Sequence, residues 1–467
     1  GGHFYLGNLG QGVGDVNENG IPWIFNVKGQ YDGHVTVNGG TFNADVNHQH
    51  WASEVNVPNT LALKDNGNGT WTVVPAVAQG TDSWRGYDRS LGYASIADAA
   101  YWATAETTVT VVANHAITET AIVESNITLD FAGEEVTCSA NPAIRIQGNV
   151  NVTVKNGNMN TEGYNFILGA SDGSSAGNLT IESGKFHGTT TVASVTKGNL
   201  NITGGEFSVE PYQGNNYAYL INCIDANYNN GDATVSIKGG IFHNWNPENN
   251  AAEGAGTNFC AEGYGAVETS TNVWVVMPAQ KMALHTGWNW FSSYIETDLE
   301  SVQNALGSSA NQIKSQTGFT QYAGSGLWVD NGEFGEFETE QMYMINTNNS
   351  HEMTLVGDLV DLSQTPITIH PNWTWIGYPM NVETNILEAV VDFTPEVGDQ
   401  IKGRSGFAYY FGEETGWIGD INTLVPGQGY MYHSIAEDTK TLKYSYPQAG
   451  SRSALKSNVT SENNHWV

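Results

Sequence analysis

Apolar and polar residues alternate along most of this chain in short runs, many of which end at glycine or asparagine. Apolar residues two positions apart are typical of a strand with one buried face, and glycine marks the turn that follows it. Four runs are nearly the same: VTVNGGTF ends at Phe42, LTIESGKF at Phe186, LNITGGEF at Phe207 and VSIKGGIF at Phe242. The pattern therefore predicts a chain that is built by repeating one strand–turn unit.

The interval between these repeats indicates a parallel β-solenoid. Phe186 and Phe207 are 21 residues apart (207 − 186), which is within the range of one solenoid coil. The interval from Phe207 to Phe242 is longer, so we expect a loop insertion there. Further strand-like runs cover residues 109–112, 121–123, 127–131, 144–146, 152–154, 179–181, 200–202 and 235–237. Before these runs, residues 93–100 predict one short helix with Ser95 as its N-cap.

Residues 1–80 are expected to form a β-strand unit at one end of the solenoid-like array. They hold short strand patterns and a hairpin turn at residues 65–69. Segment 39–75 is closely repeated by segment 239–278, which predicts two copies of one terminating unit. The parallel β-helix with its capping helix is expected over residues 81–280.

From residue 281 the chain is rich in tryptophan and carries an internal duplication. The matching segments are 287–291 with 372–376, 311–319 with 399–407, and 342–345 with 429–432. We therefore expect a duplicated β domain over residues 281–446, with lobes at about 283–365 and 366–446. Residues 447–467 are expected to be a polar tail or the start of a further module.

These motifs resemble those of large modular surface proteins of anaerobic gut bacteria. The order YASIADAA, TVTVVA, ITLDFAG and NVTVKNG is similar to their right-handed parallel β-helix modules, which have a pectate-lyase-like fold. The GWNW, QIKSQTGF and PGQGYM motifs resemble a Trp-rich module that recurs in the same proteins. The resemblance implies an all-β chain, a right-handed parallel β-helix followed by a two-lobed β-rich domain, and an extracellular or cell-surface location. The ends at Gly1 and Val467 lead us to expect a piece of a longer parent.

The composition excludes some classes of partner. Lys and Arg number 17 against 48 Asp and Glu, and the formal charge of −31 repels nucleic-acid phosphates and anionic membranes. No apolar stretch is long enough to span a membrane, so membrane insertion is not expected. The three cysteines, Cys138, Cys223 and Cys260, are far apart, and we expect buried thiols, with one disulfide left open.

One segment has part of the pattern of a calcium site. Asp15, Asn17 and Asn19 have the spacing of the first half of a calcium loop, but its twelfth position, which should be a bidentate Glu, is Asn26. A polar turn is the competing interpretation, and we expect no cofactor other than this Ca²⁺ candidate.

Two other patterns bear on metal binding and catalysis. His48 and His50 lie on one side of a strand pattern, but no third metal ligand is near them in the sequence. The predicted coils carry both acidic and basic residues, yet no acidic cluster recurs at coil spacing together with a base. We therefore expect no catalytic residues and no resident metal.

The tryptophans are the candidates for binding. The pairs in the duplicated segments each share one face of a strand, and we expect those pairs, at 288/290 and 373/375, to lie in the core. Trp245, beside Pro247 in a long loop, and Trp328 are expected to be exposed and able to stack on sugar rings.

Three functions follow from these patterns. The first is a non-enzymatic extracellular structural or adhesive protein, which is a fragment or subunit of a cell-surface stalk or filament-like assembly and associates with itself or with neighbouring modules. The alternative is a glycan-binding surface module. The second alternative is a polysaccharide lyase or hydrolase, because fold alone does not decide activity.

Overall fold

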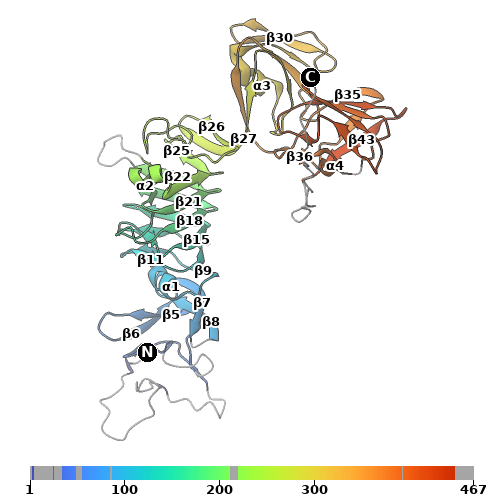
Figure 1. Ribbon diagram of the computed structural model, residues 1–467. Helices are drawn as coiled ribbons and strands as arrows, with labels where there is room; N and C mark the ends of the chain where they lie inside the picture. Colours follow the sequence, from blue (N-terminus) through green and yellow to red (C-terminus); the bar gives the residue numbers. More distant parts are fainter. Residues whose placement is uncertain are drawn as a thin grey trace, which may run out of the picture. The chain divides into compact units, whose positions relative to one another are not determined.

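The chain folds as two units, the first rich in parallel strands and the second built from antiparallel strands. The computed structural model describes residues 3–4, 25, 34–48, 55–84, 87–210, 219–391 and 393–446. The first unit, Gly1–Met277, is called the solenoid unit, and the second, Pro278–Val467, the tryptophan-rich unit. Strands make up most of the regular structure in both (Figure 1).

Three parallel sheets form a β-solenoid, to which each coil contributes one strand per sheet (Figure 1). The first sheet contains β9 (Thr107–Val111), β12 (Ile127–Asp130), β15 (Val150–Lys155), β18 (Gly177–Ile181), β21 (Gly198–Ile202) and β24 (Ala233–Ile237). The second contains β10 (His115–Ile117), β13 (Val136–Cys138), β16 (Gly157–Thr161), β19 (Gly184–Thr189), β22 (Glu206–Glu210) and β25 (Ile241–His243). The third contains β11 (Ala121–Val123), β14 (Ile144–Ile146), β17 (Phe166–Leu168), β20 (Ala193–Val195) and β23 (Ile221–Cys223). The prediction of a β-solenoid is confirmed.

The repeated phenylalanines stack on one another inside the solenoid. Phe186 pairs with Phe207 between β19 and β22, and Phe207 pairs with Phe242 between β22 and β25. The ring centroids are 5.4 Å and 5.1 Å apart, and both pairs are nearly parallel. Gly157 leaves room for this column, since a Cβ at residue 157 would lie 2.3 Å from Cζ of Phe186. The interval of 21 residues is therefore one coil, as predicted.

A short helix covers the first coil. Helix α1 (Ile96–Trp102) buries Ile96, Ala99 and Ala100 against the solenoid core. The side chain of Ser95 accepts a hydrogen bond from the backbone N–H of Asp98, which confirms Ser95 as the N-cap. The helix stabilises this end of the stack because it removes these apolar side chains from water.

The strands before α1 extend the first solenoid sheet. Its order on that side is β1-β3-β6-β5-β8-β7-β9. These strands are β1 (His3–Phe4), β3 (Thr41–Phe42), β5 (Leu61–Asp65), β6 (Trp71–Pro75), β7 (Ala78–Trp84) and β8 (Tyr87–Tyr93), while β2 (Val35–Thr36) pairs with β4 (Val55–Asn56). β5 and β6 form the expected hairpin, with Gly67 and Gly69 at positive φ in its turn.

Segments 39–75 and 239–278 make the same strand pairing. Phe42 pairs with Trp71 between the antiparallel strands β3 and β6, and Phe242 pairs with Trp274 between β25 and β27 (Val273–Leu284). β26 (Tyr264–Ser270) lies at the end of this second sheet, beside β27. At both segments a strand that pairs in parallel on one side thus pairs with an antiparallel strand on the other. The 35-residue interval from Phe207 (242 − 207) accommodates helix α2 (Asp225–Asn230), where the loop insertion was expected.

The tryptophan-rich unit is built around two five-stranded antiparallel sheets. The Trp288 sheet has the order β28-β32-β29-β30-β31, and the Trp373 sheet has the order β35-β42-β38-β39-β40. The first comprises β28 (Gly287–Phe291), β29 (Ala310–Lys314), β30 (Phe319–Gly324), β31 (Leu327–Asp330) and β32 (Tyr343–Thr347). The second comprises β35 (Asn372–Ile376), β38 (Gln400–Lys402), β39 (Phe407–Tyr410), β40 (Trp417–Gly419) and β42 (Tyr430–Ser434).

Each of these sheets packs on its own hydrophobic core. Helix α3 (Leu299–Leu306) and strand β33 (His351–Val356) lie with the first core, and β33 pairs with the second half of β27. Helix α4 (Ile386–Ala389) and strands β34 (Ile367–Ile369), β36 (Thr384–Asn385), β37 (Val390–Val391), β41 (Thr423–Leu424) and β43 (Lys440–Tyr444) accompany the second core. Within the described part of the chain, no helix has the length and apolar character needed to cross a membrane.

Candidate functional site

The tryptophan pairs of the duplicated segments face outward, which corrects the expectation that they lie in the core. On β28 the buried side chains are Asn289 and Phe291, while Trp288 is 37% exposed. On β35 the buried side chains are Thr374 and Ile376, while Trp373 is 38% exposed. Alternation along the strand was therefore predicted correctly, but the buried face is the opposite one.

The reason is that the polar residue between each tryptophan pair closes the turn before its strand. The side-chain oxygen of Asn289 accepts a hydrogen bond of 2.9 Å from the backbone N–H of His285. The hydroxyl of Thr374 accepts one of the same length from the backbone N–H of His370. Asn289 and Thr374 are buried, and each satisfies its polar side chain by this bond to the turn, so the polar side chain points inward and its tryptophan neighbours outward.

One row of residues across the outward face is the same in both sheets. In the Trp288 sheet, strand pairing places Trp290, Met344, Lys314 and Phe319 side by side. In the Trp373 sheet, the same pairing gives Trp375, Met431, Lys402 and Phe407. Packing in a core explains why the same residue types occur at equivalent positions of two inward faces, but it does not explain the same residues on faces toward solvent. The row therefore marks an outward surface whose residues are the same in both sheets.

The next row on the outward face is the same in the two sheets at only some positions. It runs Trp288, Asn346, Gln312, Gln321 and Val329 in the first sheet. In the second sheet it runs Trp373, His433, Gln400, Tyr409 and Ile418. The tryptophan and the first glutamine are common to both. The outward faces thus combine large aromatic rings with amide side chains.

The charge on these faces differs from that of the whole chain. None of the described residues in the two outward rows of either sheet is Asp or Glu, although the chain holds 48 of them. The cations of the faces are Lys314 and Lys402, one in each identical row. The ammonium of Lys314 lies 4.8 Å from the ring centroid of Trp288, a cation–π contact that orders both side chains.

A polar groove lies beside the Trp373 sheet. It has a volume of about 440 Å³ and is lined by residues that include Trp375, Glu338, Glu340 and His370. The amide of Gln316, from the other half of the unit, donates to the carbonyl of Trp373 at 2.9 Å and accepts from the N–H of Trp375 at 2.8 Å. Gln316 thereby occupies backbone groups on the outer edge of β35, the first strand of its sheet.

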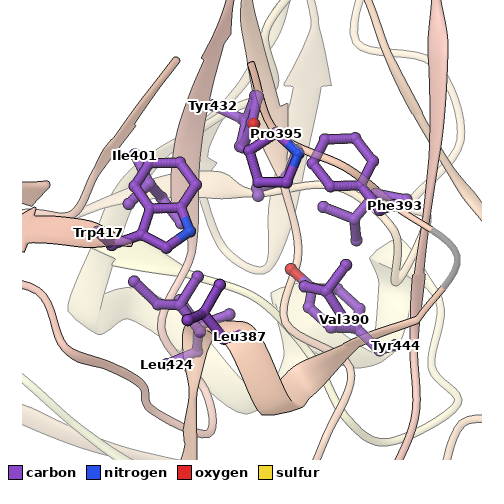
Figure 2. Close-up of a pocket in the computed structure, with 12 residues that line it drawn as sticks. Leu387, Val390, Phe393, Pro395, Ile401, Trp417, Leu424, Tyr432 and Tyr444 are labelled. Atoms are coloured by element: carbon purple, nitrogen blue, oxygen red, sulfur yellow. The ribbon is translucent and has the colours of Figure 1, made fainter. Parts of the chain in front are cut away.

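An apolar cavity in the second core is too small for a sugar or a cofactor. Figure 2 shows the side chains around it, among which Trp417 faces Phe393 and Pro395. Its volume is about 40 Å³, whereas small-molecule pockets are usually about 300–1,000 Å³. The indole N–H of Trp417 and the hydroxyl of Tyr444 have no hydrogen-bond partner among the described residues. The cavity has room for a few molecules of the size of water.

Trp245 is buried, so the expectation of an exposed sugar-binding ring is wrong. It is 6% exposed and lies between Phe242, at 5.7 Å, and Phe259, at 6.1 Å between ring centroids. The open end of a solenoid core needs an apolar cover, and the loop that carries Trp245 provides it. Proline and asparagine around this residue predict the loop but not the fact that it folds back over the last coil.

Trp328 is half-buried on the inward side of β31. It pairs with Tyr322 of β30, the ring centroids being 5.4 Å apart, and it packs against the first core of the tryptophan-rich unit. The structure therefore places neither Trp245 nor Trp328 beside the outward faces. The signal that could have identified those faces was present in the sequence as the repeated Trp, Lys, Met and Phe positions of the duplication.

The remaining predicted sites lie elsewhere. Asp15, Asn17 and Asn19 are outside the described residues, as is His50. His48 is partly buried within an ion network, where its imidazole lies 2.6 Å from Asp45 and 3.3 Å from Asp82. Arg89 contacts Asp82 at 3.0 Å, and the His48 ring stacks on Trp102. This arrangement suits a structural network that ties residues 45–48 to β7, β8 and α1.

A second polar groove, of about 540 Å³, lies beside α1 and includes Asp98, His115 and Glu119. Burial raises the pKa of Asp98 above its usual value, although the hydrogen bond from Ser95 opposes the rise. Burial lowers the pKa of His115. Asp98 is held by the hydroxyl of Ser95 at 2.8 Å in the N-cap of α1, so its contacts are those of helix capping. Among the residues with described positions, no three His, Cys, Asp or Glu side chains are grouped to hold a metal ion.

Comparison with known proteins returned no match to a protein-family model, a curated protein or a solved structure. The interpretation of the site therefore rests on its own geometry and on the comparison between the two sheets.

Proposed function

We propose that this chain is a non-enzymatic extracellular structural or adhesive protein, a fragment or subunit of a cell-surface stalk or filament-like assembly. The observation that carries the proposal is the continuous core of the solenoid unit, which runs from α1 to Trp245 and Phe259 through strands paired in register. Such a stack is a rigid spacer whose length grows with each coil. Its coils are right-handed, and its partners are further copies or neighbouring modules.

We also infer that the tryptophan-rich unit consists of two lobes that are copies of one module. The same strand order in the Trp288 and Trp373 sheets supports this, as do the equivalent pairings of Trp288 with Asn346 and of Trp373 with His433. In an adhesive protein, a duplicated module would supply two attachment points.

Electron microscopy of the purified chain tests the structural role. We expect elongated particles, alone or joined into polymers, and light scattering should give a hydrodynamic radius above that of a compact protein of 467 residues. Compact particles that do not associate at any concentration tested would contradict this role.

A glycan-binding surface module is the second candidate. It is favoured by the exposure of Trp288 and Trp373, since monomeric proteins rarely leave repeated aromatic faces toward solvent without a partner. A glycan array probed with the labelled chain tests it. Binding to a defined class of sugar supports this role, and an array without signal at micromolar protein argues against it.

A further inference from the structure

We propose that the outward faces of the Trp288 and Trp373 sheets are two equivalent binding sites for an uncharged polysaccharide, so that each chain is bivalent. This inference rests on the glycan-binding candidate and specifies where the sugar binds, how many sites there are and which chemical class they accept. Neither face shares a residue with the solenoid core, so the spacer and the binding sites can be tested separately.

The side chains of each face fit a sugar ring. Two tryptophans at alternate positions of one strand are about 6–7 Å apart and present their rings on the same side. An aromatic ring offers an apolar platform with a negative face, which suits the C–H groups of a pyranose. In the first sheet Asn346 stands beside Trp288, and Gln312 lies one strand further along the same row. In the second sheet Gln400 lies one strand beyond His433, the neighbour of Trp373. These amides supply the donors and acceptors that hydroxyl groups require.

The charges favour an uncharged ligand. The formal charge of −31 on the chain repels a polyanion, and Glu338 and Glu340 line the groove next to Trp375. A cationic ligand would meet Lys314 or Lys402 in the middle of each face, with no carboxylate beside it in the outward rows. A neutral polysaccharide avoids both penalties, and the ammonium group of each lysine can donate hydrogen bonds to its hydroxyl oxygens.

The duplication points to a ligand that repeats. Two faces that share the row Trp, Met, Lys and Phe recognise the same chemical group, and a polymer carries that group many times. Binding through both faces raises the apparent affinity well above that of one face when the ligand is long enough to reach both. A short oligosaccharide gains nothing from the second face except a second place to bind. The number of sites can therefore be measured independently of avidity.

The test compares the intact chain with Trp288→Ala, Trp373→Ala and the double variant. Affinity electrophoresis in gels that contain glucan, mannan, xylan or polygalacturonate, at 0.15 M salt, measures retention by the polymers. We expect retention by at least one neutral polymer and none by polygalacturonate. Each single variant should weaken retention about tenfold or more, and the double variant should abolish it. Calorimetry with a short oligosaccharide of the bound polymer should give two sites for the intact chain, one for each single variant and none for the double variant.

Tyr101→Ala is the matched control, because Tyr101 is a highly exposed aromatic residue on α1 in the solenoid unit. It should bind like the intact chain. If either tryptophan variant does not fold, Gln312→Ala and Gln400→Ala replace them, since they keep all rings in place.

Three results would overturn this inference while leaving glycan binding intact: one site in the intact chain, stronger retention by polygalacturonate than by neutral polymers, or full binding by the double variant. Failure to bind any glycan would instead remove the second candidate function itself, whatever electron microscopy shows for the first.

Discussion

The rings of Phe186 and Phe207 stack at 5.4 Å between centroids, with their planes 16° from parallel, and both side chains are almost fully buried. Phe207 stacks in the same way on Phe242 in the following coil. The ring of Phe207 is thus stacked between those of Phe186 and Phe242 along the solenoid. The column joins successive coils by packing in addition to the backbone hydrogen bonds of their strands.

Phe207→Ala should therefore be among the most damaging single substitutions in the solenoid unit. Removing a buried phenylalanine usually costs about 3–5 kcal/mol, because the apolar surface is lost and a cavity remains. Urea unfolding followed by far-UV circular dichroism measures the change in the free energy of unfolding. Tyr101→Ala, on the surface of the same unit, should change it by less than about 1 kcal/mol. Equal effects of the two substitutions would show that the phenylalanine column does not stabilise the stack.

Much of the solenoid could be predicted because its pattern is local. Apolar residues two apart and a glycine at each turn indicate strands, and the 21-residue interval between Phe186 and Phe207 gives the length of one coil. The ends of the stack could not be predicted in the same way. Trp245 is buried because the last coil has no following coil to cover it, which is a property of the assembled core and of no local sequence.

The ion network around His48 should make the solenoid unit less stable in alkaline solution. Burial by itself would lower the pKa of His48, but hydrogen bonds to Asp45 and Asp82 and the charges of both carboxylates outweigh it and raise the pKa from 6.5 to about 9. A raised folded-state pKa means that the charged imidazole stabilises the fold fully below pH 6.5 and that this contribution is lost as the pH rises through 9. One pKa unit corresponds to about 1.4 kcal/mol, so the loss should be about 3 kcal/mol.

Thermal unfolding between pH 6 and pH 9.5 measures this loss, with His48→Phe as the comparison. The phenylalanine cannot titrate and keeps an aromatic ring to stack on Trp102, so the difference between the two proteins should shrink as the pH rises. Asp82 gives the opposite dependence. Burial would raise its pKa, but hydrogen bonds with His48 and Arg89 lower it, so its contribution is present above pH 3.8 and is lost in more acidic solution. A constant difference across the alkaline range would mean that His48 is not charged in the folded chain.

Cys138 and Cys223 should resist alkylation until the chain unfolds. Both are buried as free thiols. Burial raises the pKa of Cys138, and burial together with the charge of Glu253 raises the pKa of Cys223 to about 12, so little reactive thiolate forms at neutral pH. Iodoacetamide without reductant should leave both unmodified in buffer and modify both in 8 M urea, as read by peptide mass spectrometry. A disulfide-linked peptide containing either residue would contradict the structure.

The candidate site was only half predictable from the sequence. The alternation of Trp288, Asn289 and Trp290 correctly placed both rings on one face, and the duplication identified their equivalents. Which face is buried depends on the turn that Asn289 closes, and a hydrogen bond between its side chain and the backbone of His285 is not visible in a pattern of apolar residues. With large apolar residues on both faces of these strands, hydrophobicity alone does not choose between them.

Ser292 should couple the two halves of the tryptophan-rich unit. Its hydroxyl accepts a hydrogen bond from the N–H of Tyr378 at 3.0 Å and donates to the carbonyl of Gln428 at 2.7 Å, while its own N–H donates to Gly427. Ser292 is fully buried, so Ser292→Ala leaves an N–H and a carbonyl without a partner, at a cost of about 1–3 kcal/mol for each. Hydrogen–deuterium exchange should then show reduced protection of the Tyr378 amide.

Ser293→Ala is the matched control for that coupling, because Ser293 is equally buried but its hydroxyl contacts only Gln280 and Ile295, in the same half of the unit. Both variants should lower the free energy of unfolding, since each loses two or more buried hydrogen bonds. Only Ser292→Ala should increase exchange at Tyr378, whereas Ser293→Ala should increase exchange at the Ile295 amide. The same exchange pattern in both variants would show that the halves are held together by packing around Phe291 and Met342 and not by Ser292.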